Sequence, residues 1–182
     1  TLATVEEVTG RPGRFSVKVL QRPRYIDVSK CIACGTCASK CPKKVDDEHN
    51  QGLAKRKAAF LTFPQAVPLK YSIDPAQCIF LNKGRCRACE KHCPAKAIDF
   101  TQEPRERYLN VGAIILAPGF DTFEARLKGE YGYGRYPNVL TSLDFERVLS
   151  ASGPFQGHIQ RPSDGHEPRK VAWIQCVGSR DA

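Results

Sequence analysis

The 182-residue sequence lacks the patterns that define several common classes of protein. No apolar run approaches roughly 18 residues, so we expect no membrane-spanning helix. Residues 1–8 have neither a basic start nor an apolar signal core, which indicates a cytoplasmic protein. The G-x-G-x-x-G, Walker and G-x-S-x-G motifs are also missing. The chain alone therefore shows no loop that would hold the phosphates of a nucleotide.

The composition is that of an ordinary globular protein, with 41% hydrophobic and 26% charged residues. Its formal net charge of +9 would suit a nucleic acid or an acidic redox partner. The basic residues are scattered, however, and the longest basic cluster, at 55–57, lies near the acidic residues 46–48. We interpret that cluster as a solvated loop and expect no nucleic-acid partner.

Cysteine, by contrast, is abundant, and eight of the nine cysteines fall in two runs. The first run, at 31–42, has the C-x-x-C-x-x-C-x-x-x-C-P spacing with which bacterial ferredoxins bind a [4Fe–4S] cluster. The second run, at 78–94, is a degenerate copy with seven residues between its first two cysteines. Disulfides suit exported proteins, and structural zinc takes two Cys-x-x-Cys pairs. Both runs therefore favour [4Fe–4S] clusters, and two clusters indicate electron transfer.

In two-cluster ferredoxins the fourth cysteine of one run ligates the other cluster. By this analogy, cluster one is expected to take Cys31, Cys34, Cys37 and Cys93. Cluster two is expected to take Cys78, Cys86, Cys89 and Cys41. Gly35 would let the first loop turn where a Cβ would crowd it.

An internal repeat surrounds the two runs. Asp27 and Asp74 each stand four residues before the first cysteine of a run. Each half predicts a strand, a cysteine loop, a short helix ending near Cys-Pro and a second strand. This is the (βαβ)₂ layout of an α+β ferredoxin-like domain, expected over 24–103. The chain departs from the repeat at two places. One is a long connection at 47–70, expected to cover a cluster or dock on a neighbour, and the other is the longer second cysteine loop, with a turn expected at 82–84.

Lys83, Arg85 and Arg87 place positive charge beside the expected second cluster. Cations near a cluster favour its reduced, more negative state, so they would raise its reduction potential and make it the electron-accepting side. A set of surface cations with no redox effect fits the sequence equally well.

The residues before the repeat predict an antiparallel hairpin. Residues 2–9 and 15–20 alternate in hydrophobicity around turn residues at 10–13. An isolated hairpin is barely stable in water, so it needs a sheet or a partner surface. The sequence opens directly in strand-like residues and stops just after an apolar run, so we expect it to be a piece of something larger.

The residues after the repeat predict an α/β unit. The apolar runs at 111–117 and 170–176 fit strands buried on both faces of a parallel sheet. Between them, Thr141 and Asp144 form the pattern of a capping box for a helix over about 142–151. Cys176 ends the apolar run at 170–176. A lone cysteine there is usually a small buried hydrophobe, although a strand end is also a common ligand position.

Several motifs resemble the A subunit of heterodisulfide reductase, and together they cover essentially the whole chain. They are Tyr25-Ile-Asp-Val28, Phe63-Pro-Gln-Ala-Val-Pro68, Gly112-Ala-Ile-Ile-Leu-Ala-Pro-Gly-Phe120, Tyr136-Pro-Asn-Val-Leu-Thr-Ser142 and Cys176-Val-Gly-Ser-Arg-Asp181. The resemblance implies a ferredoxin domain at 24–103 inserted into an incomplete α/β, thioredoxin-reductase-like FAD domain. Residues 1–23 would be a hairpin of that domain and 104–182 its continuation. The sheet partners of the hairpin would then lie in missing segments of the FAD domain.

The resemblance also implies a flavoprotein hub for electron bifurcation in methanogenesis. Electrons from a hydrogenase or formate dehydrogenase would be split between a low-potential ferredoxin and a disulfide-reducing partner subunit. Related flavoproteins place an Ala-Thr-Gly turn against FAD. This implies Ala117, Pro118 and Gly119 as the FAD contacts here, although Pro118 lacks an N–H donor. Cys176 would be a ligand of a further [4Fe–4S] cluster.

Two other hypotheses stand beside this one. The chain could be a free-standing two-cluster ferredoxin-type carrier whose extra residues dock it to partners. A nucleic-acid-binding metal module is the weaker alternative. In the leading hypothesis the chain is an electron relay within a larger oxidoreductase, and it needs no catalytic acid or base.

Overall fold

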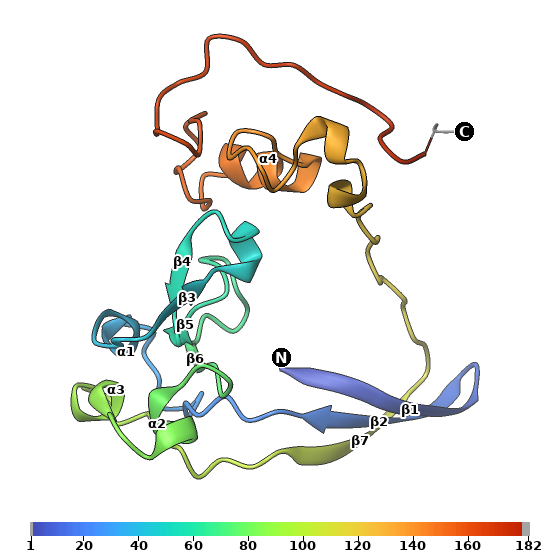
Figure 1. Ribbon diagram of the computed structural model, residues 1–182. Coiled ribbons are helices and arrows are strands. Elements are labelled where there is room, and N and C mark those ends of the chain that lie inside the picture. The colour runs from blue at the N-terminus through green and yellow to red at the C-terminus, as the bar shows by residue number, and fades with distance from the viewer. Residues whose placement is uncertain (1, 180–182) are drawn as a thin grey trace. The chain divides into compact units, whose positions relative to one another are not determined.

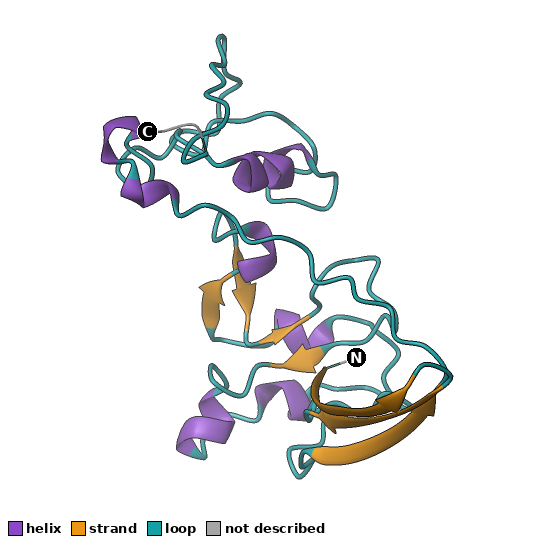
Figure 2. Ribbon diagram, turned by 90° about the vertical axis from the view of Figure 1, so that its right-hand side faces the viewer, coloured by secondary structure: helices purple, strands orange, loops and turns teal. Residues whose placement is uncertain are grey.

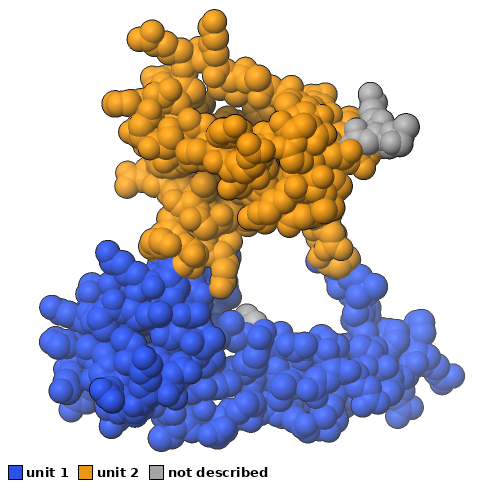
Figure 3. All heavy atoms as spheres, viewed as in Figure 1, with its two compact units in different colours: residues 1–45, 56–117 blue, residues 46–55, 118–182 orange. Residues whose placement is uncertain are grey.

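The computed structural model describes residues 2–179, and the chain divides into two compact units (Figure 3). Unit 1 comprises residues 1–45 and 56–117, and unit 2 comprises residues 46–55 and 118–182. Within the described part of the chain, no helix is long and apolar enough to cross a membrane.

Unit 1 contains a three-stranded antiparallel sheet (Figures 1 and 2). Its strands, in spatial order, are β1 (Ala3–Arg11), β2 (Arg14–Gln21) and β7 (Arg105–Val111). The predicted hairpin is therefore confirmed. One sheet partner of the hairpin lies in this chain, because β2 pairs with β7 from Phe15 opposite Val111 to Gln21 opposite Arg105. The expectation that the sheet partners would all lie in missing segments is wrong.

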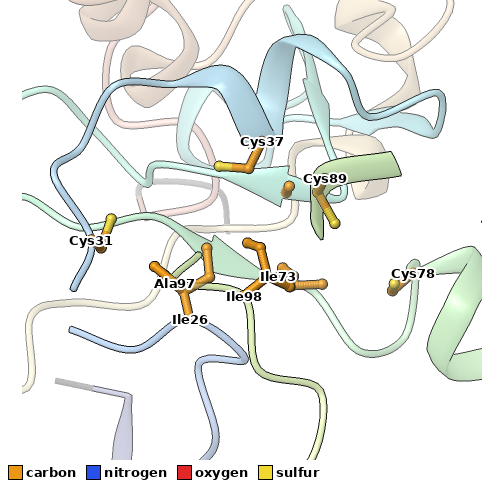
Figure 4. Packing of buried hydrophobic residues seen from close by; sticks show 9 residues of the cluster. Ile26, Cys31, Cys37, Ile73, Cys78, Cys89, Ala97 and Ile98 are labelled. Atoms are coloured by element: carbon orange, nitrogen blue, oxygen red, sulfur yellow. The ribbon is translucent and has the colours of Figure 1, made fainter. Parts of the chain in front are cut away.

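Two short antiparallel pairings form the centre of the ferredoxin-like region. β5 (Ala59–Phe60) pairs with β6 (Ser72–Ile73), and Ile26 pairs with Ile98 in an isolated bridge. Apolar side chains from both pairings pack together, with cysteines around them (Figure 4). Ile26 is only 1% exposed, so the centre of this small core excludes water.

The two strands that flank the long connection each pair with a strand from that connection. β3 (Lys44–Asp46) pairs with β4 (Lys55–Lys57), whereas β6, before the second run, pairs with β5. Ala58 and Ala59, at the start of β5, are both buried. Residues 47–70 thus supply a core strand as well as a connection. The 55–57 cluster, interpreted from the sequence as a solvated loop, is a strand.

Three short helices accompany the cysteines. They are α1 (Thr36–Ser39), α2 (Ile79–Lys83) and α3 (Ala88–Lys91). α1 and α3 each contain the third cysteine of a run, as the repeat predicts. α2 fills the enlarged second loop, where a turn was expected at 82–84. Gly84 ends α2 with a left-handed φ of 64°, and Asn82 donates to the carbonyls of Pro75 and Cys78 at 2.8 and 2.9 Å.

Unit 2 contains α4 and three 3₁₀ helices. These are η1 (Glu48–Asn50), η2 (Ala125–Leu127), η3 (Gly129–Tyr131) and α4 (Ser142–Leu149). The predicted capping box of α4 is confirmed, because Thr141 and Asp144 each accept the other's N–H, at 3.2 and 2.8 Å. On the same helix, the buried Arg147 donates to Asn50 Oδ1 at 3.3 Å.

The two apolar runs expected as buried strands form no strand after Val111 within residues 2–179. Ile115 and Leu116 are 93% and 85% exposed, and Trp173 packs edge-on against Phe145 with ring centres 5.0 Å apart. A strand buried on both faces of a parallel sheet needs paired neighbours on each side. The described residues provide none for these runs, so this expectation is wrong for the chain.

Candidate metal centres

Two cavities in unit 1 are each lined by four cysteines. Cavity one is lined by Cys31, Cys34, Cys37 and Cys93. Cavity two is lined by Cys41, Cys78, Cys86 and Cys89. Each cavity therefore receives three cysteines from one run and the fourth from the other. These are the groups that the ferredoxin analogy brings together, while their role as ligands stays a prediction.

The cysteines are not arranged around a single ion. Within residues 2–179, no three Cys, His, Asp or Glu side chains are placed to hold one metal ion. Each cavity instead presents four thiols from two different runs, and soft thiolates in sets of four are the ligands that iron–sulfur clusters take.

The first cysteine of each run is positioned by the same turn. Asp27 Oδ1 accepts the N–H two residues later at 2.9 Å, and its main-chain carbonyl accepts the N–H of Cys31 at 2.9 Å. Asp74 repeats both hydrogen bonds, at 3.0 Å and, to Cys78, at 2.9 Å. The aspartate before each run therefore fixes the start of a cysteine loop.

The loop before each third cysteine passes through left-handed backbone. Gly35 and Arg87 occupy equivalent positions before α1 and α3, with φ of 78° and 56°. A Cβ on Gly35 would lie 2.9 Å from the hydroxyl oxygen of Tyr71, so this position needs glycine for space as well as for φ. Arg87 adopts the same region with a side chain. Its guanidinium pairs with Glu90 at 2.5 Å and lies 4.9 Å from the ring centre of Phe80.

The cysteines of the two cavities follow the same order of exposure. The first and third of each run are buried, the fourth is partly buried and the second is exposed. Burial raises the pKa of Cys37 to about 11 and the pKa of Cys89 to about 12. A hydrogen bond with the Thr36 hydroxyl lowers the pKa of the exposed Cys34. Ligation of iron would therefore release protons from Cys37 and Cys89.

Apolar and aromatic side chains complete both cavities. In cavity one these include Ile26, Tyr71, Ala97 and Ile98. In cavity two they include Ala58, Ala59, Ile73, Phe80 and Phe100. Burial raises the pKa of Tyr71, and the neighbouring cysteines add to the effect. Such surroundings lower the local dielectric, so a charge placed near the sulfurs acts strongly on them.

Of the three cations singled out in the sequence, only Arg87 lines cavity two. Its charge is balanced by Glu90. Lys83 and Arg85 are exposed and do not line the cavity. Their effect on a reduction potential remains a prediction, and the structure gives it little support.

Two lysines to which the sequence gave no role at the site, one of them in the basic cluster at 55–57, contact the site cysteines. Lys57 donates to the main-chain carbonyl of Cys41 at 2.6 Å, and Lys70 donates to that of Cys31. Both lysines come from the connection at 47–70, outside the internal repeat. No local signal marks them, because their contacts depend on how that connection folds back.

The remaining predicted site residues lie outside both cavities. Ala117, Pro118 and Gly119 are exposed and belong to no helix or strand, and Cys176 is exposed as well. Their roles toward a flavin and a further cluster stay predictions.

Comparisons with known proteins agree with the geometry of the cavities. Residues 24–45 match a family model described as a 4Fe-4S binding domain. Over all 182 residues, the chain is 50% identical to the iron-sulfur A subunit of CoB--CoM heterodisulfide reductase from Methanocaldococcus jannaschii. Over 181 residues, it is 45% identical to the A subunit of H(2):CoB-CoM heterodisulfide,ferredoxin reductase from Methanothermobacter marburgensis. It is 47% identical, also over 181 residues, to the A subunit of H(2)/formate:CoB-CoM heterodisulfide,ferredoxin reductase from Methanococcus maripaludis.

Over its whole length, the chain corresponds to part of the heterodisulfide reductase A subunit. The resemblance found in the sequence motifs is thereby confirmed. All three matches cover the whole chain, yet the chain spans only 27% of the length of each relative. Together with the match to a 4Fe-4S binding domain, the family identifies iron–sulfur electron transfer as the chemistry of this region.

Proposed function

We propose that each cavity binds one [4Fe–4S] cluster and that the chain relays single electrons between them. The observation that carries this proposal is the exchange of the fourth cysteine between the two runs. Cys93 lines cavity one and Cys41 lines cavity two, as in a two-cluster ferredoxin. When bound, the clusters would supply one-electron oxidation and reduction.

The protein's own contribution is to hold the two sites close together, each with two buried thiols. Cys37 and Cys89 are buried on α1 and α3, which contact each other (Figure 4). Cys37 adds to the raised pKa of Cys89, so the two thiols lie within electrostatic range. At the other side of each site, Cys34 and Cys86 are exposed. We infer that electrons pass between the sites near Cys37 and Cys89 and are exchanged with partners near the two exposed cysteines.

We further propose that residues 24–103 are an insertion in a larger FAD domain. The strands that flank this region, β2 and β7, are neighbours in one sheet, with Gln21 opposite Arg105. A segment that leaves and returns at adjacent strands suits insertion into a pre-existing sheet. The exposed residues Ala117, Pro118 and Gly119 would then contact FAD only when further segments complete that domain. Cys176 would likewise need cysteines from outside this chain to hold a cluster.

The partners proposed for the larger protein follow from the names of the relatives. Those names include a heterodisulfide, ferredoxin and the donors H(2) and formate. We propose that the complete protein works with other heterodisulfide reductase subunits, a soluble ferredoxin, and a hydrogenase or formate dehydrogenase in electron bifurcation. Joining this chain to the remaining segments and recording a flavin spectrum tests the FAD part. Absence of bound flavin would favour the alternative of a free-standing two-cluster carrier.

The ligand exchange is tested by removing one fourth cysteine at a time. Cys93→Ala should lose the cluster of Cys31, Cys34 and Cys37, although it lies in the other run. Cys41→Ala should lose the cluster of the second run. Iron and acid-labile sulfide per chain measure the loss, and paramagnetic NMR signals of cysteine β-protons identify the cluster that remains. Cys176→Ala is the matched control and should leave both clusters in place.

If Cys93→Ala retains its first-run cluster intact, the proposed ligand sets are wrong. If the anaerobically reconstituted wild-type chain contains no iron, the proposed function itself is wrong.

A further inference from the structure

Two lysines from one connecting segment each contact a cysteine of a different cavity. Lys57, at the end of β4, donates to the carbonyl of Cys41, which lines cavity two. Lys70, just before β6, donates to the carbonyl of Cys31, which lines cavity one. Each cavity therefore has one ammonium group at the main chain of one of its cysteines.

Both ammonium groups are held in place by the fold around them. The residue after Lys57, the buried Ala58, donates its N–H to the carbonyl of Lys43 at 3.1 Å. The carbonyl of Lys70 accepts a hydrogen bond from Arg24 Nη1 at 3.0 Å. Both lysine side chains are partly buried. The main chain at both lysines is thus held by hydrogen bonds, and each ammonium group donates to a cysteine carbonyl.

The charges of these two lysines are not balanced by a nearby carboxylate. In the described residues, neither Lys57 nor Lys70 takes part in an ion pair within 4.0 Å. Other cations of the region are paired, as Arg87 is with Glu90 and Lys55 with Asp46. An unbalanced charge in partly buried surroundings is weakly screened, so its field reaches the adjoining cavity.

We propose that Lys57 and Lys70 each raise the reduction potential of the cluster in the adjoining cavity. Reduction adds negative charge to a cluster, and a fixed ammonium group stabilises the reduced state more than the oxidised one. The connection at 47–70 would thus set the potentials of both sites, one lysine for each. This inference rests on the proposed function, because it requires that each cavity holds a cluster.

The test compares the two lysines in the intact, cluster-loaded chain. Lys57→Gln and Lys70→Gln keep a hydrogen-bond donor but remove the charge. Redox titration, with the cysteine β-proton signals of each cluster followed by paramagnetic NMR, gives the two potentials separately. Each variant should lower the reduction equilibrium constant of its own cluster about tenfold, which is about 59 mV for one electron. The reduction potential of the other cluster should shift by much less.

Three controls distinguish charge from structure. Lys57→Arg and Lys70→Arg retain the charge and should keep both potentials near the wild-type values. Lys55→Gln removes a neighbouring exposed ammonium that is already paired with Asp46, and it should shift neither potential. If a glutamine variant loses its cluster, a genetically encoded acetyl-lysine at the same position removes the charge and keeps the long side chain and its N–H.

The outcomes separate this inference from the proposed function. Clusters present with both potentials unchanged in the glutamine or acetyl-lysine chains would overturn the inference alone. Equal shifts of both clusters in each variant would also overturn it, because the lysines would not act on separate sites. A wild-type chain that binds no iron would overturn the proposed function.

Discussion

The ion pair between Arg56 and Asp74 allows a quantitative test of how the second site is held. Arg56 Nη2 lies 2.8 Å from Asp74 Oδ2, and the two side chains are only 10% and 16% exposed. The other oxygen of Asp74 accepts a hydrogen bond in the turn that leads to Cys78. The guanidinium also lies 4.1 Å from the ring centre of Phe60. Arg56→Gln would therefore leave a largely buried carboxylate without its main partner at the start of the second cysteine run.

The expected cost follows from the burial of this pair. Removing one partner of a buried ion pair costs about 3–5 kcal/mol, because an uncompensated charge remains. Since both side chains keep some exposure and glutamine can still donate, we expect a loss of about 2–3 kcal/mol. The adjacent pair of Lys55 and Asp46 is a matched control, since its side chains are 62% and 66% exposed. An exposed pair contributes about 0.2–1 kcal/mol, so Lys55→Gln should cost no more than that.

Anaerobic urea denaturation of the cluster-loaded chain measures both changes. The visible absorbance of the clusters and far-ultraviolet circular dichroism report the midpoint, and the m-value converts it to a free energy. With an m-value of about 1–3 kcal/mol/M, Arg56→Gln should lower the midpoint by roughly 0.7–3 M. Because Asp74 leads into Cys78, the cluster of cavity two should be lost first. A midpoint for Arg56→Gln equal to that of Lys55→Gln would refute the reasoning.

Three further changes test other parts of the structure. In the metal-free chain near neutral pH, iodoacetamide should alkylate Cys34 before Cys37. A neighbouring hydroxyl lowers the pKa of Cys34, while burial raises the pKa of Cys37 to about 11. Mass spectrometry of the peptides gives the order of alkylation, and equal rates at the two cysteines would contradict the prediction. Gly35→Ala should cost about 1–2 kcal/mol in urea denaturation. Adding Tyr71→Phe should recover part of that loss, because it removes the hydroxyl that the new Cβ would meet. No recovery would mean that the clash with Tyr71 does not cause the loss. Thr141→Ala should cost about 1 kcal/mol of stability in thermal unfolding, and Thr141→Ser is a nearly neutral control. Equal losses in the two variants would mean that the Thr141 hydroxyl does not stabilise α4 as its N-cap.

The parts of the fold that the sequence predicted correctly are those determined by short-range chemistry. The hairpin before the repeat and the capping box of α4 both depend on residues close together in the chain. The turns at Asp27 and Asp74 are equally local, since each is closed by hydrogen bonds within four residues. The cysteine spacing belongs to the same class, because it fixes which thiols one loop can present together.

The features that the sequence left open concern pairing between distant segments. β3 pairs with β4 and β5 pairs with β6, and strands of two or three residues carry no periodicity that indicates their partners. The apolar runs at 111–117 and 170–176 show what a strand could bury, but composition does not reveal whether neighbouring strands are present. The contacts of Lys57 and Lys70 with the cysteine carbonyls were unpredictable for the same reason, because they depend on the path of the connection.

The two halves of the repeat share their turns, their left-handed residue before a helix and the order of exposure of their cysteines. For the two proposed clusters, we therefore look for sources of a difference in potential where the chain departs from the repeat. One departure is the enlarged loop at 79–85, which leads into Arg87 and brings Phe80 to cavity two. The other is the connection at 47–70, which brings a lysine to each cavity. Because reduction potential follows charge and burial near the sulfurs, we expect the potentials of the two proposed clusters to depend on these two insertions as well as on the cysteine runs.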